Sequence, residues 1–368
     1  MKTGRSLQDI AAELERQTAS RKDYIAPQGA IHAEVVNNEV KLDGLNGDPI
    51  GITPHAHGQL SDHLGIPKKY YDRMLAEQPA LLAQNVNTWF RTAAAEKRMV
   101  RTLDGRARGF LSPKFRPLDN YDLATAVLPM LMEKGAHIAS AELTETRLYI
   151  KAIFPDLSDE LPAGLTWGNG HARVAAYAGN QAGRVVAAIV ISNSDVGAGA
   201  LRIEPSVFTT WCTNLAIMAE AAMKKYHVGK AFTADEDMTV FRDVTRQADD
   251  RALWMKVQDI TRAAFSAEAF RAAIAQIRDA GAAPLVSQDL PKVVEMTVKR
   301  LALPESTQSS ILTHLARGGD LTRWGLSSAI TATANDFAEY EGATELERAG
   351  GKVLALTGHD WNAIATAA

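Results

Sequence analysis

The most constraining feature of this 368-residue sequence is a run of alternating residues on both sides of Asp104-Gly105. Asp-Gly favours a two-residue hairpin turn, because both central positions of that turn need a positive φ angle. The period-two alternation over residues 99–103 and 106–111 therefore predicts two antiparallel strands that pair Arg101 with Arg108. One face of the ribbon would carry Lys97, Met99, Arg101, Arg106, Arg108 and Phe110.

Two arginines directly opposite one another repel, at a cost of about 0.2–1 kcal/mol in a sheet. An anion lying across the pair would relieve that repulsion, and a phosphate backbone is a suitable one. Phe110 on the same face could stack on a base. The alternative is a solvated edge hairpin that is charged to discourage aggregation.

The rest of the pattern predicts an α+β fold. Helical spacing follows Pro67 and Pro79, and again spans residues 119–134, whereas residues 138–154 and 185–204 look like strands. We expect a helix after Pro205, with Phe208 and Trp211 on its apolar stripe, and a helical chain from residue 232 onward. The expected architecture is a central antiparallel β-hairpin layer with packed helices, followed by a helical C-terminal region. Its predicted parts are an N-terminal helix with short strands (1–52), an α+β core that binds nucleic acid (53–230), and a helical region for oligomerisation or partner binding (231–368).

Charge is unevenly distributed along the chain. The net charge is −3, so the whole protein is no polycation. Residues 91–230, however, carry 17 Lys and Arg against 13 Asp and Glu, and residues 97–116 carry seven basic residues against Asp104 alone. This local charge of +6 favours an anionic partner.

Other cations stand near aromatic or polar residues. Lys114 and Arg116 follow the hairpin, and Arg147, Tyr149 and Lys151 share one strand face. A basic cluster follows at Lys224, Lys225, His227 and Lys230. We expect all of these to contact nucleic acid; the alternatives are an exposed strand face and cations that offset a helix dipole.

Catalytic constellations are weak. His55, His57 and His63 could suggest a metal site, but no matched carboxylate motif accompanies them. Cys212 is the single cysteine, which excludes an internal disulfide and favours a core position. There is no phosphate-binding loop ending in Gly-Lys-Ser/Thr, which argues against intrinsic ATP use. We therefore expect no enzyme activity, no cofactor and no metal, with a metal-dependent nuclease as a minor alternative.

Residues 109–120 resemble a signature of phage- and plasmid-borne proteins classed as domain of unknown function 932. Residues 191–202 with 211–214, residues 226–229 and residues 322–326 resemble further motifs of that family, and Leu215 departs from it. The resemblance implies a mobile genetic element with recombination or replication genes nearby. The order hairpin–helix–hairpin–helix is also similar to the core of single-strand annealing proteins, which form rings and hold DNA in a basic groove.

These observations lead to the expectation of an ATP-independent single-stranded DNA-binding and annealing protein. We expect it to be a cytoplasmic homo-oligomer without a membrane span, with a single-strand-binding protein or an exonuclease as candidate partners. The alternative is a protein-binding accessory factor of a mobile element, for anti-defence or host takeover, with no nucleic-acid activity.

Overall fold

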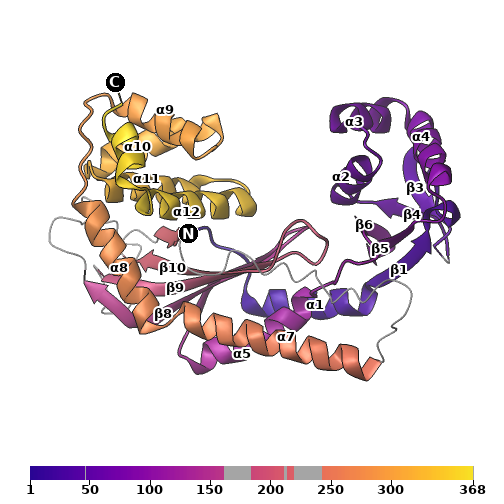
Figure 1. Ribbon diagram of the computed structural model, residues 1–368, viewed down its shortest axis with the longest axis horizontal. Helices are drawn as coiled ribbons and strands as arrows, with labels where there is room; N and C mark the ends of the chain where they lie inside the picture. Colours follow the sequence, from indigo (N-terminus) through magenta and orange to yellow (C-terminus); the bar gives the residue numbers. More distant parts are fainter. Residues whose placement is uncertain (46, 161–183, 211–213, 219–242, 368) are drawn as a thin grey trace.

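The computed structural model describes residues 1–45, 47–160, 184–210, 214–218 and 243–367. It confirms the α+β class, but the strands form two separate sheets rather than one layer. We call residues 22–111 the N-terminal lobe. The central lobe comprises the second sheet with the helices α1, α5, α7 and α8, and five further helices complete the chain (Figure 1).

The N-terminal lobe is built on a six-stranded sheet in the order β1-β5-β6-β4-β3-β2. β4 pairs with β6 in parallel, so the strands before residue 52 and the predicted hairpin belong to one sheet. The predicted division after residue 52 therefore falls inside this lobe. Its elements are β1 (Lys22–Pro27), β2 (His32–Val36), β3 (Glu39–Asp43), β4 (Ile50–Ile52), α2 (Pro54–His63), α3 (Lys68–Glu77), α4 (Pro79–Thr92), β5 (Lys97–Leu103) and β6 (Arg106–Leu111).

Helix α4 follows the sequence pattern closely. Pro79 occupies its first turn, where the missing amide proton costs nothing. Leu82, Val86 and Phe90 are buried against the sheet, as the helical spacing predicts. Trp89, on the same helix, points outward and is 50% exposed.

The central lobe contains a five-stranded antiparallel sheet in the order β11-β10-β9-β8-β7. Alternate residues of β8 and β9 point to opposite faces. One face packs on α1, α5, α7 and α8; in Figure 1, α1, α5 and α7 lie below the sheet and α8 lies at its left. The elements are α1 (Leu7–Ser20), α5 (Asn120–Glu133), β7 (His137–Leu143), β8 (Leu148–Glu160), β9 (Arg184–Asn193), β10 (Arg202–Thr209), β11 (Asn214–Ile217), α7 (Asp243–Ala264) and α8 (Ala267–Gly281).

The prediction of a helix after Pro205 is wrong for the residues that the structure describes. Residues 202–209 continue as β10 and return as β11, with Phe208 paired to Leu215. The apolar spacing in this segment suits two buried strands as well as a helix, and a short apolar run does not distinguish them.

The C-terminal region is helical in its described part, as expected. Two of its helices end at glycines: α8 ends at Gly281, and Gly319 caps α10 with a φ of 69°. Helices α11 and α12 cover the second face of the central sheet. At Gly351 a Cβ atom would lie 1.7 Å from the carbonyl oxygen of Ile217, so only glycine lets α12 approach β11 this closely. The helices are α9 (Leu290–Arg300), α10 (Gln308–Gly318), α11 (Arg323–Asp336), α12 (Tyr340–Leu354) and α13 (Gly358–Ala365). Within the described ranges, no helix has the length and apolar character to span a bilayer.

Candidate nucleic-acid interface

The hairpin turn forms where the sequence predicts it. Asp104 and Gly105 have φ angles of 52° and 71°, which both positions of this turn require. The pairs nearest the turn are the predicted ones, Leu103 with Arg106 and Thr102 with Ala107. A β-bulge then shifts the register, so that Arg101 faces Gly109 and Arg108 has no residue opposite. The expected direct opposition of Arg101 and Arg108 is therefore wrong.

The bulge also changes which side chains face the core. Beyond it, Phe110 joins Ala107 and Val100 on the buried side of the sheet. Its ring stacks on Phe90 at 5.8 Å between centroids, and it is 5% exposed. A one-residue slip moves every later side chain to the opposite face. Phe110 is thus a core residue and is not available to stack on a base.

Arg101 is almost fully buried, and its guanidinium group is held by three oxygens of its own chain. Nε donates to Asp23 Oδ1 at 2.8 Å, Nη2 to Asp119 Oδ1 at 2.7 Å, and Nη1 to the carbonyl of Asp195 at 2.5 Å. Burial acts to lower the pKa of Arg101, but the neighbouring carboxylates outweigh it and raise that pKa further. Arg101 is therefore charged, and each of its three guanidinium nitrogens donates to an oxygen of its own chain.

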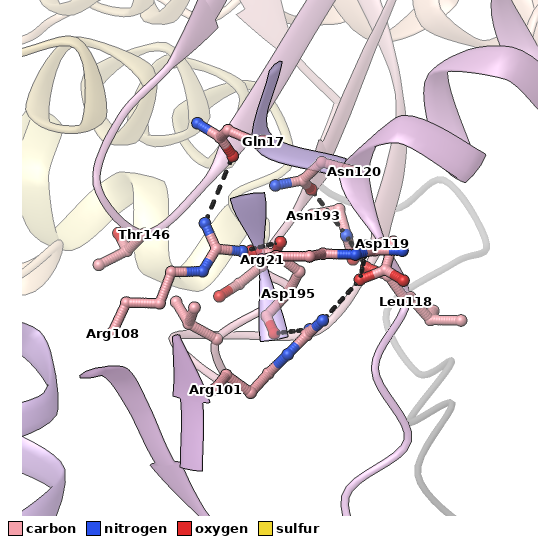
Figure 2. Close-up of polar contacts among 12 residues, drawn as sticks. Gln17, Arg21, Arg101, Arg108, Leu118, Asp119, Asn120, Thr146, Asn193 and Asp195 are labelled. Carbon is pink, nitrogen blue, oxygen red and sulfur yellow. Dashed lines mark hydrogen bonds and ion pairs between the residues drawn. The ribbon is translucent and has the colours of Figure 1, made fainter. Parts of the chain in front are cut away.

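Arg108 reaches the same place from the next strand. Its Nη2 forms an ion pair with the Asp195 carboxylate, and its Nη1 lies 3.4 Å from Gln17 Oε1 (Figure 2). Arg21 binds Asp119 at 2.5 Å. We call this group the ion-pair clasp: Arg21, Asp23, Arg101, Arg108, Asp119 and Asp195.

The clasp corrects the expectation that a phosphate backbone lies across Arg101 and Arg108. The two hairpin arginines do meet carboxylates at one point, but these come from their own chain, and no phosphate is needed to relieve their repulsion. Asp119 stands at the N-cap position of α5, but it makes no capping bond and binds Arg101 and Arg21 instead. Asp195 lies in the turn after β9.

The strand face that carries Arg147, Tyr149 and Lys151 is also covered. Lys151 Nζ forms a 2.6 Å ion pair with Glu347 of α12, and Tyr149 lies 5.3 Å from the ring of Tyr340. Burial raises the pKa of Tyr149 to about 12, and burial lowers that of Lys151 in spite of its partner Glu347. Arg147 reaches the Ala198 carbonyl and lies 3.9 Å from Glu341. The shared strand face was predicted correctly, but α11 and α12 cover it, so Lys151 and Tyr149 offer no DNA surface here.

Part of the predicted basic segment is on the surface. Lys97 and Lys114 are exposed, and Arg116 is half-buried. The Arg106 side chain is 53% exposed and pairs with Glu39 at 3.2 Å. The remaining predicted contacts, Lys224, Lys225, His227 and Lys230, lie outside the described residues.

The three histidines each have a partner in their own chain. His55 contacts the Val196 carbonyl at 3.1 Å, His57 the Tyr71 hydroxyl at 2.8 Å, and His63 the Gln28 side chain at 2.9 Å. Burial lowers the pKa of His57 to about 4. Across the part of the chain that the structure describes, no three His, Cys, Asp or Glu side chains gather as metal ligands would.

Comparisons with protein-family models, with curated proteins and with solved structures found no match to this chain.

Proposed function

We propose that this chain binds single-stranded DNA and promotes annealing without ATP, as a homo-oligomer, through exposed cations rather than through the hairpin arginines. One observation carries the proposal. With the two buried arginines set aside, residues 97–116 still hold five basic residues against Asp104, a local charge of +4. Of these five, Lys97 and Lys114 are exposed, and the Arg106 side chain is 53% exposed beside Glu39.

Such cations suit the chemistry of annealing. A protein that pairs two strands must hold their phosphates and leave the base edges free, so phosphate contacts supply the affinity. The resemblance to phage- and plasmid-borne proteins agrees with this proposal. The buried rings of Phe110 and Tyr149 take no part in it.

Two other aromatic side chains are better placed to stack on bases. Tyr70 of α3 and Trp89 of α4 are each 50% exposed, which is unusual for large rings in a folded chain. Lys69 precedes Tyr70, Arg91 lies two residues after Trp89, and both cations are exposed. An exposed ring can stack on a base while cations elsewhere on the surface hold the phosphate backbone.

Titration of a labelled single-stranded oligonucleotide at 50 and 200 mM salt tests the proposal. We expect binding that weakens steeply with salt. In the triple variant Lys97→Ala/Arg106→Ala/Lys114→Ala, the slope of log K against log salt should fall by about 2, because each phosphate contact on a single strand contributes about 0.7. An annealing assay with complementary oligonucleotides and no nucleotide cofactor follows strand pairing.

A matched control removes three exposed cations from the C-terminal half, Lys256, Lys299 and Lys352. Its net charge changes by the same amount, so an equal loss of binding would show bulk attraction and refute this interface. Absence of binding by the wild-type chain at 50 mM salt would refute the function itself.

A second candidate is a protein-binding accessory factor. Helices α5 and α7 pack side by side, and Tyr121, Met132 and Met255 are exposed on them, the two methionines at 59%. Exposed apolar groups of this kind mark contact surfaces between proteins. A folded chain without affinity for DNA would favour this second candidate.

A further inference from the structure

The two lobes have separate hydrophobic cores. One core lies between the N-terminal sheet and α2–α4, and the other joins the central sheet to α1, α5, α7 and α8. Among the described residues, no helix or strand of one lobe packs extensively on an element of the other. Each lobe is therefore held together by apolar burial of its own.

Contacts between the lobes are chiefly polar. The clasp joins Arg101 and Arg108 of the N-terminal lobe to Asp119 and Asp195 of the central lobe. Around it, further polar contacts cross between the lobes, among them Gln59 Nε2 to the Val196 carbonyl at 2.8 Å, Arg16 to Asp104 at 2.7 Å, and Ser20 to Asp104 at 2.6 Å. Polar interfaces between domains commonly permit relative motion.

The covalent connections also permit separation. The N-terminal lobe is one continuous segment, so the chain enters it only at Arg21 and leaves it only through residues 112–119. Among the described elements, no strand or helix has to break for the two lobes to move apart.

The clasp buries several charged groups but adds little net stability to the fold. Taking guanidinium and carboxylate groups out of water costs nearly as much as their mutual attraction returns. The pairing of donors with acceptors is also incomplete, because the buried Nε of Arg108 has no hydrogen-bond partner among the residues that the structure describes. A polyanion that supplies several phosphates can compete with these carboxylates, since guanidinium groups bind both in the same forked geometry.

We propose that the ion-pair clasp is an autoinhibitory contact, in which Asp119 and Asp195 occupy the positions that DNA phosphates take on Arg101 and Arg108 once the lobes separate. This inference rests on the proposed function and adds its regulation. In the closed form only the exposed cations bind DNA. In the open form the two hairpin arginines join them.

The substitution Asp195→Asn tests the clasp with two independent measurements. Small-angle X-ray scattering without DNA should show a larger radius of gyration, because one carboxylate that bridges the lobes is lost. Affinity for a single-stranded oligonucleotide should rise about tenfold, as expected for one released charged contact. Adding Arg101→Ala and Arg108→Ala to this variant should cancel the gain, because both arginines bind DNA in the open form.

Asp62→Asn is the matched control, because it removes the same charge from an exposed position on α2 of the N-terminal lobe. An Asp195→Asn chain that stays closed, or that opens but binds no tighter than this control, overturns the inference. In either case wild-type binding with the expected salt dependence leaves the proposed function standing. Without any DNA binding by the wild type or the variant, both fail.

The variant Arg108→Gln/Asp195→Asn covers the case in which Asp195→Asn does not fold. It removes both partners of one buried pair, so no unpaired charge is left inside the protein. It should also open and should bind DNA through Arg101. An unchanged radius of gyration in this folded variant overturns the inference.

Discussion

Lys151 of β8 and Glu347 of α12 form an ion pair sealed between the central sheet and the helix above it, and Lys151→Met is the sharpest test of that arrangement. The two side chains are 1% and 0% exposed, with 2.6 Å between Nζ and Oε2. Lys151 Nζ also lies 4.5 Å from the ring centroid of Tyr340. Methionine is an unbranched side chain one heavy atom shorter than lysine, and it removes the charge and the N–H donors that Glu347 accepts from.

The expected cost is large. Removing one partner of a buried ion pair typically costs about 3–5 kcal/mol, because the other charge stays in a poorly polarisable interior. Glu347 has no other support in the described structure: its Oε1 lacks a hydrogen-bond partner, and its Oε2 accepts only from Lys151. A loss of that size is a substantial part of the ~5–15 kcal/mol that stabilises a typical domain.

Urea unfolding of a double-mutant cycle measures the effect. Lys151→Met should lower the free energy of unfolding by about 3–5 kcal/mol, and adding Glu347→Leu should recover most of it, because an apolar pair of similar volume suits this site. Lys352→Met is the control, since Lys352 is exposed on the same helix. Its stability should stay close to that of the wild type.

Two results would refute the reasoning. If the free energy of unfolding of Lys151→Met lies within about 1 kcal/mol of the wild-type value, the ion pair is not shielded from water as it is in the structure. If the double variant is less stable than Lys151→Met alone, the buried Glu347 charge is not the source of the cost.

Acidification from pH 7 to pH 5 should lower the free energy of unfolding by roughly 2 kcal/mol through His57. Burial lowers the pKa of His57 to about 4 in the folded chain, so over this pH range the histidine takes up a proton mainly in the unfolded chain, and protonation favours unfolding. Urea titrations at both pH values should show a smaller loss for His57→Gln than for the wild type, and equal losses would contradict the burial of that ring. Gly105→Ala should destabilise the chain by about 1 kcal/mol, because a φ of 71° strains any residue with a Cβ atom although no atom obstructs the site. The control is Gly47→Ala, because Gly47 also has no atom within 4 Å of an added Cβ but has no positive φ. Identical midpoints of thermal unfolding for the two variants would argue against the Asp104-Gly105 turn.

Features that depend on neighbours in sequence were predictable. The turn at Asp104-Gly105 follows from the local demand for positive φ angles, and the buried stripe of α4 follows from helical spacing. The helical C-terminal half and the breaks at Gly281 and Gly319 have the same local origin. These signals need only a few consecutive residues, so the printed sequence contains them in full.

The bulge at Arg108 was not predictable in this way. The alternation continues through it without a break, and only pairing with the neighbouring strand shows which residue is extra. From that one residue onward the faces exchange, which places Phe110 in the core. The same limit applies to residues 202–217, where burial within a sheet decided between strands and a helix.

The sequence determined that residues 97–116 carry a dense positive charge, and that two arginines lie close together on a tight hairpin. Only the tertiary structure decided which anions those arginines meet. Asp23, Asp119 and Asp195 come from segments 18 to 94 residues away. Asp23 reaches Arg101 through the pairing of β1 with β5, whereas Asp119 and Asp195 approach because the two lobes dock at this point. Charge is a property of the residue and can be read from the chain, whereas its neutralisation depends on distances in space that no local pattern specifies.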